Sequence, residues 1–136
     1  MHKIEIKLKF RSGHRLMPPY IGKCNNPHGE GYTAICFFEG RLDEKGMVID
    51  FGEAKTKIKE WLDNNWDHAY LHKYDDEVGV WLYNNKYKTF SLPYNPTAEN
   101  MSGFLFNVIF NQLKLKVCKV GIIESFEDSI AWYEKK

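Results

Sequence analysis

The chain has 136 residues, 43% hydrophobic and 15% aromatic, which is enough for one domain with a buried core. Its formal net charge of +1 argues against general nucleic-acid binding and leaves room only for a local basic pocket. The apolar runs are too short to span a bilayer, and the first ten residues, MHKIEIKLKF, lack a signal-peptide core. These features predict a single domain over residues 1–136, located in the cytoplasm, with neither nucleic acid nor membrane as a partner.

Two strands are predicted in the amino-terminal third. Residues 3–10 alternate charged side chains with isoleucine, leucine and phenylalanine, which is the period of a half-buried strand. Residues 15–31 are rich in proline, glycine and asparagine and are expected to form a loop. Residues 32–39, YTAICFFE, are β-branched and aromatic and predict the second strand.

The middle of the chain predicts one clear helix and a less regular segment. Apolar residues recur at helical spacing over residues 52–64, which indicates an amphipathic helix. Residues 65–95 carry weaker patterns, in which 77–85 could form a short helix and 88–93 a short strand. We expect two of the histidines of the chain, His2 and His72, to lie at the surface.

The carboxy-terminal third predicts a helix followed by two strands. Thr97 is the expected helix N-cap, and the apolar face that follows runs to about Lys114. Residues 116–125 and 129–135 then read as strands. The whole order predicts an α+β fold, an antiparallel four-stranded sheet with two helices on one face.

A metal site is one interpretation of His14, His28 and Glu30. If His28 and Glu30 open the second strand, their spacing directs both side chains to one face, and His14 follows the neighbouring strand. Two imidazoles and a carboxylate would make a three-ligand zinc site with an open position. Polar loop residues, with Glu30 in solvent, are an equally good interpretation of the spacing alone.

Three further groups could carry chemistry. Cys24 lies in a polar loop, where it is either a reactive thiol or an inert one. Asp67 and His68 are adjacent, so they could be an acid–base pair or an exposed helix-end pair. Glu124 ends an apolar strand, where it could bind the N–H edge of a guanine-like or pterin ring or face water.

Six ordered segments resemble the family of 6-pyruvoyl- and 6-carboxy-tetrahydropterin synthases over nearly the whole chain. The matching segments are Phe10 to His14, Cys24 to Tyr32, Gly46 to Phe51, Trp66 to His68, Asn95 to Asn100, and Ile123 to Ser125. In the second of these, Glu30 stands where the family has the second histidine of a His-Gly-His motif.

The resemblance implies a fold and an assembly. The fold is the tunnelling fold, in which trimerisation joins the sheets of small α+β subunits into a barrel and two trimers stack. Because family active sites lie at subunit interfaces, the chain would be a homo-oligomer, a hexamer made of two trimers.

The resemblance also implies a reaction. The substrate would be 7,8-dihydroneopterin triphosphate, and zinc on His14, His28 and Glu30 would polarise its side-chain hydroxyls. By analogy, Cys24 would be the base, Asp67 with His68 the acid–base couple, and Glu124 with Thr97 would bind the ring. The favoured product is 6-carboxy-5,6,7,8-tetrahydropterin, a precursor of queuosine and other deazapurines.

The departure at Glu30 leaves alternatives. A carboxylate ligand makes the site more negative and admits divalent metals other than zinc. If Glu30 misses the metal, metal binding is weak, and the chain could be a pterin- or purine-binding homologue without turnover. A 6-pyruvoyl synthase with the same site is the remaining alternative. A side-chain-cleaving enzyme that feeds folate is disfavoured, because such members tend to carry glutamate where Cys24 stands.

Overall fold

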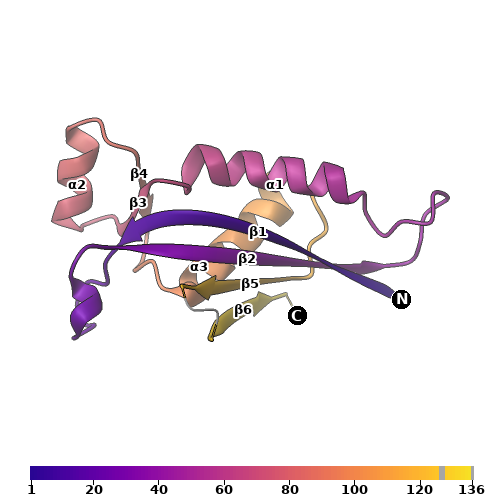
Figure 1. Cartoon of the computed structure of the whole chain (residues 1–136), viewed down its shortest axis with the longest axis horizontal. Helices are drawn as coiled ribbons and strands as arrows, with labels where there is room; N and C mark the ends of the chain where they lie inside the picture. The colour runs from indigo at the N-terminus through magenta and orange to yellow at the C-terminus, as the bar shows by residue number, and fades with distance from the viewer. Residues whose placement is uncertain (126–127, 136) are drawn as a thin grey trace.

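The computed structural model describes residues 1–125 and 128–135, which form a sheet flanked by helices (Figure 1). The strands in this part of the chain are β1 (His2–His14), β2 (His28–Gly40), β3 (Tyr70–Lys73), β4 (Thr89–Leu92), β5 (Lys119–Glu124) and β6 (Ile130–Glu134). The helices are α1 (Phe51–Asn65), α2 (Glu77–Asn84) and α3 (Ala98–Asn107), with a 3-10 turn at Lys23–Asn25 and a π-helical turn at Val108–Gln112.

The sheet has six strands in the order β4-β3-β1-β2-β5-β6, so the predicted four-stranded sheet is wrong in strand number. It is also mixed, because β1 pairs with β3 and β3 with β4 in parallel, whereas the other neighbours are antiparallel. The short strand expected at 88–93 is confirmed as β4. The strand that the sequence did not reveal, β3, has only four residues, which are too few to show an alternation.

The first two strands are longer than their hydrophobic patterns. Both run for 13 residues, and their pairing ends with His14 opposite His28. The expectation that His14 follows the first strand is therefore wrong, since it is the last residue of β1. The cause is that the glycines and polar residues at these ends carry no alternating apolar signal, although their backbones continue the antiparallel ladder.

One face of the sheet holds the core. Helices α1 and α3 cover this face, as predicted, and α1 runs along the β1–β2 pair (Figure 1). The fully buried helical side chains on it include Ala54, Ile58, Leu62, Met101, Leu105 and Phe106. Thr97 is the N-cap of α3 and accepts a hydrogen bond from the Asn100 N–H at 3.1 Å, which confirms the predicted start of this helix.

The remaining helix, α2, stands at the end of the sheet where β1 ends and β2 begins, and the N-terminus lies at the opposite end (Figure 1). It confirms the short helix expected at 77–85 and corrects the count of two helices to three. No helix in the described residues has both the length and the apolar character needed to cross a membrane.

Candidate metal centre and active site

Three candidate metal ligands converge where β1 ends and β2 begins. His14 and His28 are cross-strand partners, and Glu30 lies two residues along β2 on the same face. Their ligand atoms all lie within 4.8 Å of one another. The Nε2 atom of His28 is 3.1 Å from His14 Nε2 and 3.2 Å from Glu30 Oε1.

The hydrogen bonds around these three residues leave their lone pairs facing inward. His14 Nδ1 donates to the Pro96 carbonyl at 2.9 Å, and His28 Nδ1 donates to the Asn26 carbonyl at 2.7 Å. Because a carbonyl only accepts, the proton of each neutral ring is on Nδ1, and Nε2 carries a lone pair. Two such atoms and a carboxylate oxygen repel one another unless a cation lies between them, so the donor set fits zinc.

Burial determines how His14 titrates. The ring is 2% exposed, and desolvation, opposed by its bond to Pro96 and aided by His28, lowers its pKa to about 4. Since the ordinary pKa is 6.5, the unfolded chain binds this proton at a higher pH than the folded chain does. The stability that neutral His14 contributes is therefore complete above pH 6.5 and is lost as the pH falls towards 4.

We expect the metal-free protein to lose about 3 kcal/mol of unfolding free energy between pH 6.5 and 4 through this residue. Urea unfolding at a series of pH values, in the presence of a chelator, measures the loss. The same series on His14→Gln should lack this component, whereas His2→Gln, at an exposed histidine, should keep it. A parallel pH dependence of the wild-type protein and His14→Gln would contradict the expectation.

Cys24 lies on the 3-10 turn and is half-buried, so part of this residue is accessible. The Tyr20 hydroxyl is hydrogen-bonded to this thiol, which raises the pKa of the phenol. Gly22 makes room for this contact, because it has φ +155° and a Cβ at this position would lie 2.6 Å from the Tyr20 oxygen. The turn therefore holds a phenol against the thiol.

A cavity of about 550 Å³ opens near the candidate ligands without including them, since Pro96, whose carbonyl is bonded to His14, directly precedes Thr97 in its wall. Thr97 from the start of α3 and Glu124 from the end of β5 line it, together with Leu16 and Tyr20. Burial, and next the negative charge of Glu30, raise the pKa of Glu124. The cavity is large enough for a bicyclic ring, and a carboxylate in its wall is an acceptor for ring N–H groups.

Asp67 and His68 form a hydrogen-bonded pair between α1 and β3. His68 Nδ1 contacts Asp67 Oδ2 at 2.8 Å, and the backbone N–H of Arg11 donates to Asp67 Oδ1 at 2.9 Å. Burial alone would raise the pKa of Asp67, but these two hydrogen bonds lower it overall. The carboxylate fixes the ring through Nδ1, so Nε2 of His68 is directed away from it towards solvent.

Within the described part of one chain, these residues divide into two groups. His14, His28 and Glu30 converge at the sheet end, next to the cavity that contains Thr97 and Glu124. Asp67 and His68 line other cavities, which share no residue with that one, although Glu30 and His68 both line one of these other cavities. A single chain therefore does not bring the Asp67–His68 pair into the same cavity as Glu124.

A family model described as 6-pyruvoyl tetrahydropterin synthase matches residues 3–136. The chain belongs to this family. The predicted resemblance and the prediction of a lyase of the tetrahydropterin synthase type are thereby confirmed.

Individual members of the family are also similar. The 6-carboxy-5,6,7,8-tetrahydropterin synthase of Rickettsia conorii is 39% identical over 116 residues, 83% of each chain, and that of Haemophilus influenzae is 30% identical over 133 residues, 92% of this chain and 94% of the relative. The solved 6-pyruvoyl tetrahydropterin synthase of Caenorhabditis elegans matches with a TM-score of 0.73 and 25% identity, covering 99% of this chain and 96% of that one.

The structure of this family member also contains a buried polar cluster that the sequence did not reveal. Asp76 is fully buried, and His72, expected at the surface, is 4% exposed. His72 stacks on Tyr70 at a ring distance of 5.9 Å and is covered by Gly79 of α2. The only signal for Asp76 was its place before the helical pattern at 77–85, because its charged partner, Arg15, comes from a distant segment.

Proposed function

We propose that the chain is a zinc-dependent lyase that converts 7,8-dihydroneopterin triphosphate and water to 6-carboxy-5,6,7,8-tetrahydropterin, acetaldehyde and triphosphate. The observation that carries the proposal is the convergence of His14, His28 and Glu30 beside a ring-sized cavity. The similarity to relatives named 6-carboxy-5,6,7,8-tetrahydropterin synthase favours the carboxy product. Such a product would serve the synthesis of queuosine and other deazapurines.

The cavity beside the metal centre would bind the pterin ring. The Glu124 carboxylate would accept two hydrogen bonds from the N–H and NH2 edge of the ring. Thr97, at the start of α3, would flank the same ring. In this orientation the three-carbon side chain of the substrate would reach towards the metal centre.

Cys24 would abstract a proton from the substrate side chain. The Tyr20 hydroxyl, which is hydrogen-bonded to this thiol, would help to orient it for this step. When bound to His14, His28 and Glu30, zinc would supply Lewis-acid polarisation of the side-chain hydroxyls, and the carboxylate would also accept other divalent metals.

Asp67 and His68 would be the acid–base couple that works with Cys24, donating protons to the substrate and accepting protons from it. Since they do not share a cavity with Glu124 in one chain, we propose that a second copy of the chain supplies them. The assembly would be the tunnelling fold, with three sheets joined edge to edge into a barrel and two such trimers stacked as a hexamer. Joining would also cover the open edge strands β4 and β6.

A 6-pyruvoyl synthase is the second candidate. The 6-pyruvoyl tetrahydrobiopterin synthase of Dictyostelium discoideum is 27% identical over 134 residues, and the same metal centre would serve that product. The two functions differ in the fate of the three-carbon side chain, which is either retained whole as a pyruvoyl group or cleaved, so that one carbon stays as the carboxyl group and two leave as acetaldehyde. Product analysis therefore separates them.

Incubation of the purified protein with 7,8-dihydroneopterin triphosphate should yield the 6-carboxy product and acetaldehyde, measured by liquid chromatography with mass spectrometry. Cys24→Ala should lower turnover by about 10²- to 10⁴-fold, the range of a lost general base, and should leave zinc content unchanged. Cys118→Ala removes a half-buried thiol outside the site and should retain full turnover.

Two outcomes would contradict this function. A pyruvoyl product without acetaldehyde would support the second candidate. A wild-type protein that binds pterin but turns over no substrate, with Cys24→Ala behaving identically, would indicate a binding protein without catalysis.

A further inference from the structure

The segment 15–17, directly after the candidate ligand His14, is held to the thiol turn. The Leu16 N–H donates to the Cys24 carbonyl at 2.8 Å, and the Asn25 side chain donates to the Leu16 carbonyl at 3.1 Å. The Leu16 side chain lines the proposed ring cavity. The backbone position of Leu16 therefore determines where Cys24 lies relative to that cavity.

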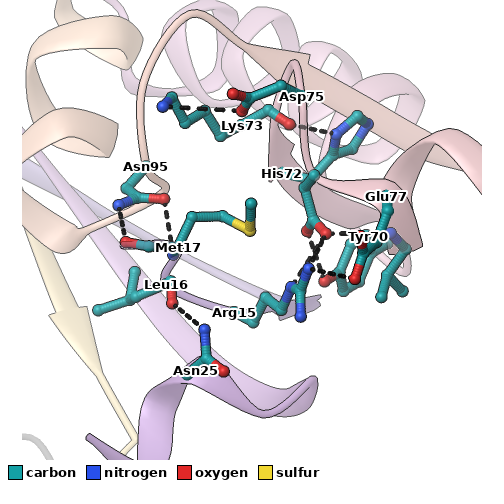
Figure 2. Close-up of polar contacts among 12 residues, drawn as sticks. Arg15, Leu16, Met17, Asn25, Tyr70, His72, Lys73, Asp75, Glu77 and Asn95 are labelled. Carbon is teal, nitrogen blue, oxygen red and sulfur yellow. Dashed lines mark hydrogen bonds and ion pairs between the residues drawn. The ribbon is translucent and has the colours of Figure 1, made fainter. Parts of the chain in front are cut away.

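Asn95 holds the same segment from the other side. Its side chain accepts from the Met17 N–H and donates to the Met17 carbonyl, both at 2.9 Å, as Figure 2 shows. Its own carbonyl accepts from the Thr97 N–H and from the Asn100 side chain, both at 2.9 Å. One residue thus joins the segment after β1 to the start of α3.

The loop that contains Asn95 also reaches the metal centre. The carbonyl of Pro96, the next residue, accepts a hydrogen bond from His14 Nδ1–H, which keeps the proton off Nε2, the atom that faces His28. Arg15 anchors the segment at its other end through Asp76, at 2.7 and 2.9 Å. Hydrogen bonds to the backbone therefore connect His14, Cys24 and Thr97 to one another, and the contact between Asn95 and Met17 joins the two sides of this network.

We propose that Asn95 is a positioning residue for this site: its two bonds to the Met17 backbone hold the metal ligand His14 and the thiol of Cys24 against the ring cavity. The inference rests on the proposed function for what the site does, but the arrangement itself involves only residues of this chain. Asn95 neither lines the ring cavity nor belongs to the three candidate ligands, and it would act through Met17 and Pro96.

The test compares Asn95→Ala with Asn107→Ala, which removes a similar side-chain bond, to the Gly103 carbonyl at 2.9 Å, from an exposed position in α3. Asn95→Ala should weaken zinc binding about 10- to 100-fold in competition with a chromophoric chelator, the range for outer-shell partners. It should also speed the alkylation of Cys24 by iodoacetamide, measured in a Cys36→Ala/Cys118→Ala background. Asn107→Ala should leave both values at the level of the parent protein.

Wild-type zinc affinity and alkylation rate in folded Asn95→Ala would overturn the proposal, whatever the change in melting temperature. If Asn95→Ala does not fold, Asn95→Asp tests the same contact, because it keeps the acceptor for the Met17 N–H and loses the donor to the Met17 carbonyl, and it should shift zinc affinity and alkylation rate in the same directions. Unchanged values of both in Asn95→Asp would then overturn the proposal. Failure of the proposed function would be visible separately, as an absence of turnover in the wild-type protein, because neither readout needs the pterin substrate.

Discussion

Replacing Glu30 by alanine is expected to lower zinc affinity by roughly 100-fold or more, because even partners that only orient a ligand are worth 10- to 100-fold. The geometry supports a direct role for this carboxylate. One of its oxygens, Oε2, is bound by the Ser125 hydroxyl, while Oε1 faces His28 Nε2 at 3.2 Å. Ser125 therefore orients the carboxylate so that its other oxygen is directed to the centre between the two histidines.

The measurement is the zinc content of the purified protein together with chelator competition. His28→Ala should show a loss similar to that of Glu30→Ala, and Glu60→Ala, at an exposed glutamate of α1, should show none. Glu30→His should restore zinc binding. It should also reduce the range of divalent metals that bind, since imidazole replaces a hard oxygen ligand. Tight zinc binding by Glu30→Ala, together with its loss in His28→Ala, would show that Glu30 is not a ligand.

Replacing Asp76 by alanine is expected to lower the free energy of unfolding by about 3–5 kcal/mol, which is the cost of removing one partner of a buried ion pair. Asp76 is completely buried and accepts from Arg15, from the Tyr70 hydroxyl at 2.9 Å and from the Val78 N–H at 3.0 Å. Figure 2 shows Arg15 directed towards Tyr70 and the start of α2. Without the carboxylate, a guanidinium that is only 12% exposed has no buried counter-charge.

Urea unfolding at one fixed protein concentration measures this loss. The matched control is Glu77→Ala, since Glu77 is also an acidic partner of Arg15 but is 86% exposed at 3.7 Å, and such pairs contribute at most about 1 kcal/mol. Asp76→Asn keeps an acceptor for the helix cap, so its loss of unfolding free energy should lie between those of Asp76→Ala and Glu77→Ala. Equal stabilities of Asp76→Ala and Glu77→Ala would mean that the ion pair does not hold α2 to the sheet.

Much of the fold was predictable because its elements carry local signals. Residues 52–64 repeat at the helical period, and Thr97 precedes a helix as a cap, so both helices of the core were located correctly. The strand β3 belongs to a different case. It has only four residues and is positioned by pairing with β1 and β4, which is information that no short window contains.

The candidate site divides in the same way. The sequence by itself determined the family and the types of side chain present, since motif residues such as Cys24, His28 and Glu30 can be recognised from their order and spacing. Only the tertiary structure decided that β1 continues to His14 and so places it opposite His28.

The tertiary structure also decided how the site is held together. The hydrogen bonds between Asn95 and Met17 and between Arg15 and Asp76 join residues 78 and 61 positions apart in the chain. Such contacts depend on how distant segments pack, and a local pattern of residue types does not encode them. The chemistry of this protein was therefore readable from its residues, whereas the geometry that would let them act together came from the fold.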